Sequence, residues 1–199
     1  MSKRDPVETR RKLLDAAVTE FAANGLAGAR IDRISAAAGI SKPMLYVYFG
    51  DKEALFDAAL AREIMAAAEI DYFDPEDLPN YAGRMYDLLV ERPYLWRLMT
   101  WFHLERGQDA LLIPEGQEVL NAKQRGILAA QAKGIVTTVF QPTEIVRLVS
   151  TLIQLWCMAP PAGSRKEHKS RRDTITHALQ RLLAPAQPPT KNHEKQSEP

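Results

Sequence analysis

The chain has 199 residues, 46% of them hydrophobic, which is enough for one large or two small domains with a sizeable core, and its formal net charge is +1. No run of 18 or more apolar residues occurs, and the N-terminus lacks the apolar segment of a signal peptide, so we expect a cytoplasmic protein with no membrane partner. Cys157 is the only cysteine, which excludes an internal disulfide and a cysteine-clustered metal site.

Charge is distributed unevenly along the chain. Residues 1–53 carry nine Lys and Arg against seven Asp and Glu, residues 54–160 carry nine against fourteen, and residues 161–199 carry eight against four. The N-terminal part is therefore mildly basic and the middle is acidic. This asymmetry would orient the molecule on DNA, although an excess of two positive charges is also found on ordinary solvated surfaces.

A first amphipathic helix is predicted over residues 6–23, and the Asn24-Gly25 pair ends it. Its apolar stripe comprises Leu14, Ala17, Val18 and Phe21. Basic residues near its start, among them Arg4 and Lys12, can contact the DNA backbone or simply be solvated.

Residues 31–56 have the spacing of a helix-turn-helix. A short helix presents one apolar face that comprises Ile31, Ile34, Ala37 and Ala38. Gly39 ends it, because a glycine adopts the left-handed cap conformation most easily. Ile40 is expected to enter the core beneath the turn. Ser41 is expected to cap the next helix by accepting from the N–H of Met44, since Pro43 has no N–H.

The second helix of this motif starts at Lys42. At about 100° per residue, Leu45 and Phe49 share its inward face. The outward ridge comprises Pro43, Met44 and Val47, and it is flanked by Lys42, Tyr46 and Tyr48. Apolar groups on such a ridge suit thymine methyls in a major groove, so A·T pairs are expected near the centre of each half-site. Lys52 begins the following helix, where it can bind a phosphate together with free backbone N–H groups.

No single feature of this stretch is specific, because Gly-x-Ser turns are common and the two tyrosines can be half-buried aromatics. The order and spacing of the features together favour DNA binding. The stretch GLAGARIDRISAAAGISKPMLYVYFGDKEALF resembles the N-terminal DNA-binding domain of the TetR family of bacterial transcriptional regulators, and the resemblance covers about residues 6–60.

This resemblance implies an all-α fold of about nine helices. A three-helix DNA-binding domain would occupy residues 1–50, and a larger helical domain over residues 51–184 would dimerise and bind an effector. The protein would be a homodimeric repressor released from a palindromic double-stranded DNA operator by a small apolar or amphipathic effector, with no cofactor. The DNA-binding candidates are Arg30, Ser41, Lys42, Pro43, Met44, Tyr46, Val47, Tyr48 and Lys52.

The chain departs from the family's pattern at three of these positions. Arg30 stands where the family often has a Thr or Ser that caps the second helix, although an arginine there can contact phosphate. Met44 replaces a frequent small polar residue, and Val47 replaces a frequent polar or aromatic one. These departures concern the contacts to bases more than the fold.

Further helices are predicted over residues 51–70, 80–91, 94–104, 115–133, 143–158 and 165–183. The helix after Pro93 is rich in aromatic and methionine residues, which suits the wall of an effector pocket, and ordinary core packing is the alternative. The pocket candidates are Met85, Tyr86, Leu89, Trp96, Met99, Phe102, His103 and Gln154.

The helix over residues 143–158 is apolar on almost every side and therefore needs cover on every side. The resemblance implies that the last two helices form a four-helix dimer interface with their symmetry mates. The interface candidates are Val149, Leu152, Ile153, Trp156, Ile175, Leu179 and Leu182. The proline-rich, polar residues 185–199 are predicted to be a disordered tail.

Two other functional classes are considered. An enzyme is disfavoured because the four histidines are scattered and no phosphate loop, nucleophile elbow or paired-carboxylate motif stands out, so no catalytic or metal-binding residue is predicted. A small-molecule sensor with weak or no DNA binding is the alternative to a DNA-binding regulator. Apolar neighbours favour a buried, inert thiol at Cys157 over a redox sensor.

Overall fold

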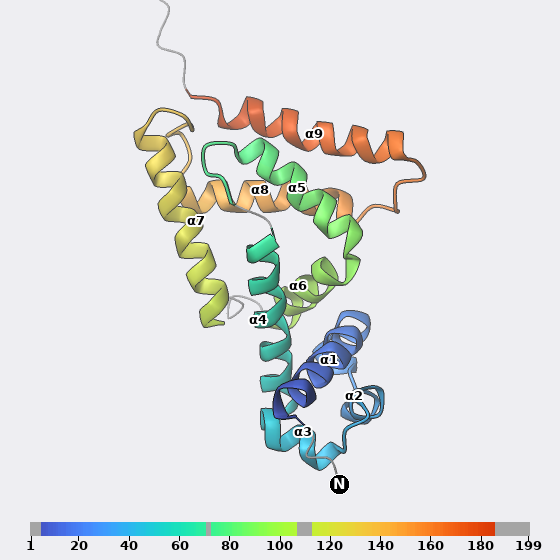
Figure 1. Cartoon of the computed structure of the whole chain (residues 1–199). Coiled ribbons are helices and arrows are strands. Elements are labelled where there is room, and N and C mark those ends of the chain that lie inside the picture. The colour runs from blue at the N-terminus through green and yellow to red at the C-terminus, as the bar shows by residue number, and fades with distance from the viewer. Residues whose placement is uncertain (1–4, 71–72, 107–112, 186–199) are drawn as a thin grey trace, which may run out of the picture.

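The computed structural model describes residues 5–70, 73–106 and 113–185, and this part of the chain forms nine α-helices and no strand (Figure 1). The predicted all-α class is therefore confirmed. The helices are α1 (Pro6–Gly28), α2 (Ile31–Ala38), α3 (Lys42–Phe49), α4 (Lys52–Ile70), α5 (Leu78–Glu91), α6 (Pro93–Arg106), α7 (Pro114–Ala132), α8 (Pro142–Cys157) and α9 (Arg165–Leu183). Residues 186–199 of the predicted tail lie outside the described residues.

Capping side chains decide where two of these helices begin. α5 starts at Leu78, earlier than predicted, because the carboxylate of Asp77 accepts a hydrogen bond from the N–H of Asn80 at 3.2 Å. α9 starts where predicted, because the hydroxyl of Ser164 accepts from the N–H of Glu167 at 3.2 Å. The apolar periodicity alone does not define the first turn of either helix.

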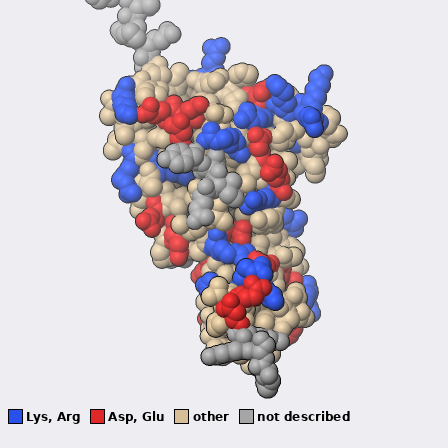
Figure 2. Space-filling model, in the orientation of Figure 1, with Lys and Arg blue, Asp and Glu red and all other residues tan. Residues whose placement is uncertain are grey.

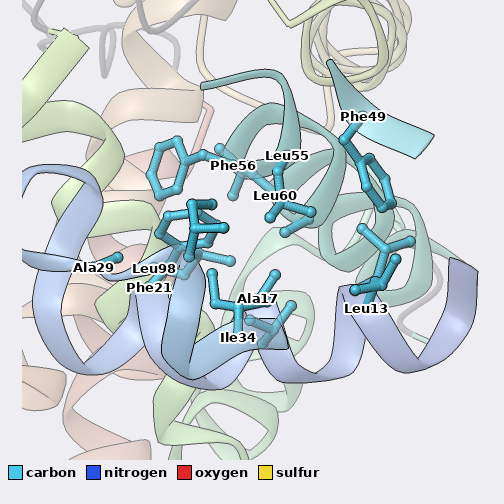
Figure 3. Packing of buried hydrophobic residues seen from close by; sticks show 14 of the residues in the cluster. Leu13, Ala17, Phe21, Ala29, Ile34, Phe49, Leu55, Phe56, Leu60 and Leu98 are labelled. Atoms are coloured by element: carbon cyan, nitrogen blue, oxygen red, sulfur yellow. The ribbon is translucent and has the colours of Figure 1, made fainter. Parts of the chain in front are cut away.

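The first three helices form a head at one end of the molecule, and α4 runs from this head into the body (Figure 1). The core of the head contains Leu13, Phe21 and Ile34, and the ring of Phe21 meets that of Phe56 edge-on at 4.9 Å (Figure 3). Leu98 of α6 belongs to the same buried cluster. The head therefore shares its core with a helix of the body, which limits the orientations that it can adopt.

The body has a second core in which α5 packs against both α8 and α9. Tyr86 is almost fully buried there, and its ring stacks on that of His168 at 5.0 Å.

Burial raises the pKa of the Cys157 thiol to about 11, so this thiol is protonated and a weak nucleophile at neutral pH. In the described part of the chain, no helix combines the length and the apolar character that crossing a bilayer requires.

Four of the predicted dimer-interface residues are buried in this second core. On α8, the core residue Ile145 is buried together with Val149 and Ile153. The four are Val149, Ile153, Ile175 and Leu179. Their side chains contact the same chain and are not available to a partner, because the apolar stripes of α8 and α9 face α5. Leu182 remains exposed, and Leu152 and Trp156 are half-buried.

α1 contains a break at Gly25, where φ is 68° and ψ is −178°. This conformation is open almost only to glycine. A Cβ at this position would also lie 2.4 Å from Oε1 of Glu105 and 2.8 Å from the ring of Trp101, both on α6. The Asn24-Gly25 stop predicted from the sequence therefore corresponds to a real break, and the helical hydrogen bonding resumes behind it up to Gly28.

We expect Gly25→Ala to lower the free energy of unfolding by about 3 kcal/mol, because it combines a strained backbone with a clash against α6. Gly134→Ala is a matched control, since Gly134 also has a positive φ of 71° but has no atom within 4 Å of an added Cβ. That variant should lose only about 1 kcal/mol. Urea unfolding monitored by circular dichroism measures the free energy of unfolding of both variants. Equal decreases in the two variants would mean that α6 moves to accommodate the added methyl group without destabilising the fold.

Candidate nucleic-acid interface

The turn between α2 and α3 is made by Gly39, which has a φ of 66° and donates its N–H to the carbonyl of Ala36 at 3.1 Å. The N–H of Ile40 bonds to the carbonyl of Ser35 at 3.0 Å, and the side chain of Ile40 is buried. This is the paired hydrogen bonding that ends a helix at a left-handed glycine. Ala37, predicted to face inward, is exposed, and Ser35 takes the inward position instead.

Neither helix of the motif has a side-chain cap, so the prediction that Ser41 caps α3 is wrong, while α2 lacks the cap that the family often has at the position of Arg30. Arg30 precedes α2 without a side-chain cap, and its N–H donates to Oε1 of Glu20 at 3.0 Å. Ser41 occupies the N-cap of α3, but its hydroxyl accepts no hydrogen bond from Met44. The first turn of α3 is closed by the backbone alone, with the N–H of Leu45 donating to the carbonyl of Ser41 at 3.1 Å. Arg30 and Ser41 therefore keep exposed side chains.

α3 is anchored by one face and exposed on the other. Leu45 is fully buried and Phe49 nearly so, which places both in the core of the head as predicted. On the other side, Val47 is 78% exposed, Met44 is 44% exposed and Tyr46 is 39% exposed. Such exposed apolar side chains on a rigidly anchored helix suit contact with another molecule.

The remaining predicted contact residues surround this exposed ridge. Lys42 and Pro43 are exposed at the start of α3, and Tyr48 is half-buried, packed against the core of the head. Lys52 is half-buried at the start of α4, and its Nζ donates to the carbonyl of Ala27 at 3.4 Å. All nine predicted DNA-binding residues thus lie between the end of α1 and the first residue of α4.

The positive charges of the head are largely paired with acids of the head. Nζ of Lys42 lies 2.9 Å from Oδ1 of Asp32, a contact that raises the pKa of Lys42 and keeps it charged. Arg33 pairs with Glu20 at 3.3 Å. Figure 2 shows acidic and basic side chains mixed on the face of the molecule in view. The sequence did not reveal these pairs, because they join residues of different helices.

The body contains a cavity of about 310 Å³ at the junction of α4, α6 and α7. It is lined by Asp57, Ala58, Ala61, Phe102, Arg106, Ile113, Pro114 and Glu115. Nη2 of Arg106 donates to Oδ1 of Asp57 at 3.0 Å, while its buried Nε has no hydrogen-bond partner within the described part of the chain. The pKa of Asp57 is raised, chiefly by burial, although Arg106 opposes this shift.

Phe102 is the one predicted pocket residue that lines this cavity. Tyr86 and Leu89 are buried in the core of the body, where Met85 and Trp96 pack against them. His103 is exposed, and its Nδ1 lies 2.7 Å from the carbonyl oxygen of Met99 on the same helix. Gln154 is half-buried on α8 and does not line the cavity. Ordinary core packing, the alternative considered for this set, therefore describes Tyr86 and Leu89 better.

Comparison with known proteins identifies the chain. A family model described as "Bacterial regulatory proteins, tetR family" matches residues 13–59, and one described as "Tetracyclin repressor-like, C-terminal domain" matches residues 77–181. The chain is 31% identical over 191 residues to the helix-turn-helix transcriptional repressor SCO4008 of Streptomyces coelicolor, covering 92% of this chain and 99% of that protein. The chain belongs to the TetR family.

Solved structures of other proteins share the fold. The transcriptional regulator SCO4942 of Streptomyces coelicolor superposes with a TM-score of 0.73 at 32% identity, covering 88% of this chain and 98% of that one. AibR, solved in complex with isovaleryl coenzyme A and operator DNA, superposes with a TM-score of 0.65 at 18% identity, covering 85% and 97%. The protein is a DNA-binding transcriptional repressor of this family and not an enzyme, as predicted.

We expect Asp32→Asn to increase the affinity for operator DNA about threefold to tenfold at 0.1 M salt, because it frees the ammonium of Lys42 and removes an anion beside the DNA backbone. Glu76→Gln is the matched control, since Glu76 forms an exposed ion pair with Lys133 at the end of α7 and likewise raises the pKa of that lysine. Fluorescence anisotropy with DNA selected by the wild-type protein from a random pool measures both. Equal affinities in the two variants would show that Lys42 does not contact DNA.

Proposed function

We propose that the protein binds a palindromic operator as a homodimer, with α3 of each protomer in the major groove of one half-site. The exposure of Met44 and Val47 on the outward ridge of α3 is the observation that carries this proposal. An eight-residue helix contacts few base pairs, so two copies at a fixed spacing are needed to select a site. The twofold symmetry of such a dimer requires a matching symmetry in the DNA.

The residues of this surface fall into two groups, one that would contact bases and one that would contact the phosphate backbone. Met44 and Val47 would meet base edges, where apolar groups favour thymine methyls. The side chains around them would bind the phosphate backbone and define the register on the duplex. These are Arg30, Ser41, Lys42, Tyr46, Tyr48 and Lys52, with Pro43 packing against the sugar-phosphate wall.

Val47→Glu tests the position of α3 in the groove. The new carboxylate would face base edges and phosphates, and we expect it to lower operator affinity at least 100-fold at 0.1 M salt. Val139→Glu is the control, because Val139 is 71% exposed in the connection between α7 and α8 and should leave the affinity unchanged. The measurement is anisotropy on the selected DNA.

Two results would contradict the proposal. Retention of affinity within threefold in Val47→Glu would place the reading surface elsewhere. Failure of the wild-type protein to enrich any sequence from the random pool would favour a small-molecule sensor with weak or no DNA binding.

The dimer would use the outward faces of α8 and α9. Leu155 of α8 and Met158, the residue that follows α8, are exposed, and Thr174 and His177 are exposed on α9. Exposed large apolar groups on a helix that is already packed on its other side support burial against a second copy. This choice of faces replaces the residues buried against α5.

Leu155→Glu should convert the dimer to a monomer, since it would place two carboxylates in an apolar, symmetric interface. Leu104→Glu is the control, because Leu104 is also exposed but lies on α6, away from these faces. Sedimentation equilibrium distinguishes the two masses. A Leu155→Glu variant that stays dimeric at micromolar concentration would exclude this interface.

The effector would bind in the cavity between α4, α6 and α7. Its volume suits a compact amphipathic molecule, with apolar walls from Ala61, Phe102 and Ile113 and a polar end at Asp57 and Arg106. The Nε of Arg106, which has no hydrogen-bond partner among the described residues, would donate to an acceptor atom of the ligand. AibR shares only its fold with this chain, so its coenzyme A ligand does not define the effector here.

An effector in this cavity would displace α4 and change the separation of the two heads. By linkage, DNA would weaken effector binding by the same factor by which the effector weakens DNA binding. Titration of the operator complex with a compound that protects Arg106 from modification tests this mechanism. Unchanged operator affinity at saturating compound would refute it.

A further inference from the structure

The break in α1 is held on both sides by side chains of α6. Behind the break, Oε1 of Glu105 accepts from the N–H of Leu26 at 2.9 Å, and Oε2 accepts from the N–H of Ala27 at 3.2 Å. Before it, Nε of Arg97 donates to the carbonyl of Ala22 at 3.0 Å. A body helix therefore supplies the hydrogen bonds that the break removes from a helix of the head.

These bonds satisfy a specific need of the backbone. A break leaves carbonyls on one side and N–H groups on the other without helical partners. A carboxylate is the strongest acceptor available for such N–H groups, and a guanidinium is a strong donor for the carbonyls. Trp101 packs so close to Gly25 that a Cβ at this position would lie 2.8 Å from its ring, so only glycine fits at this point of contact between α1 and α6. The arrangement thus defines the position of residues 26–27 relative to α6.

This position reaches the proposed DNA contact through one further bond. Nζ of Lys52 donates to the carbonyl of Ala27 at 3.4 Å, so the residue whose N–H is held by Glu105 also holds Lys52. Lys52 stands at the first residue of α4, where its ammonium and the helix N-terminus can bind one phosphate together. Lys52, Ala27 and Glu105 form one continuous chain of hydrogen bonds from the head surface to the body.

We propose that Glu105 is a positioning residue for DNA binding, which acts through Ala27 on Lys52, and that this inference rests on the proposed phosphate contact of Lys52. It also provides a route for regulation. Phe102 and Arg106, which line the cavity, lie on the same helix as Glu105 and on its adjacent face. A ligand that rotates α6 would shift Glu105 and so release Lys52 from its position.

A double-mutant cycle of Lys52→Met and Glu105→Gln tests this chain of contacts. Lys52→Met should lower operator affinity about tenfold at 0.1 M salt and reduce the slope of log affinity against log salt by about two per dimer, one for each protomer. Glu105→Gln should lower affinity about fivefold and also reduce this slope. In the Lys52→Met background, Glu105→Gln should have no further effect.

The direction of the effect separates positioning from bulk electrostatics. Removing an anion generally strengthens DNA binding, so the control Glu118→Gln, at an exposed position on α7, should leave affinity unchanged or slightly raised. Glu105→Gln is expected to do the opposite. An additive cycle, or a salt slope that Glu105→Gln leaves unchanged, would overturn the proposal. Failure of the wild-type protein to bind any selected DNA would instead refute the proposed function.

Amide hydrogen exchange provides a second test that does not depend on the folding of a variant. In the wild-type protein, the N–H groups of Leu26 and Ala27 should exchange more slowly when the selected DNA is bound, because DNA binding stabilises the same chain of contacts. The N–H of Ile135, which bonds to Ala130 at the end of α7, is the internal reference. Equal exchange of Leu26 and Ala27 with and without DNA would overturn the proposal.

Discussion

The contact of α6 with the break in α1 is the constraint on which the rest of the molecule depends. Gly25 permits α6 to approach until Trp101 and Glu105 touch the backbone of α1. The same approach places Leu98 in the core of the head. A head attached only through α4 could pivot about that one helix, whereas the additional contact between α1 and α6 restricts this motion. In the proposed dimer on a palindromic operator, this restriction would define the spacing of the two heads.

The surface of the head suggests how affinity and selectivity are divided. Its apolar ridge can distinguish bases but contributes little long-range attraction, while its cations are largely committed to pairs such as Lys42 with Asp32. Exposed ion pairs contribute only about 0–1 kcal/mol, so a phosphate can displace Asp32 at small cost. In the proposed complex, non-specific attraction to DNA would therefore be weak, and binding would depend more on the fit of the ridge to the groove.

Local patterns predicted the head well and the body less well. Helical periodicity predicts the inward pair Leu45 and Phe49, and the backbone freedom of glycine predicts the turn at Gly39. Both signals are local, because they depend only on residues that are close in the sequence. The stripe that includes Val149 was equally compatible with burial in its own chain or against a partner, since periodicity defines an apolar face but not what covers it. Contacts such as Glu105 with Leu26 join residues 79 apart and leave no local signal.

The two sides of α6 give a physical route by which the proposed effector would be coupled to DNA binding. Trp101 and Glu105 face α1, and Phe102 and Arg106, each one residue further along, face the cavity. One residue corresponds to about 100° of rotation, so the two faces adjoin along the same helix. A helix moves largely as a rigid unit, because its backbone hydrogen bonds join each turn to the next. A ligand that rotates α6 to fit the cavity must therefore strain or break the bonds of Glu105 to α1, and the energy of that disruption sets an upper limit on the coupling that this route can transmit.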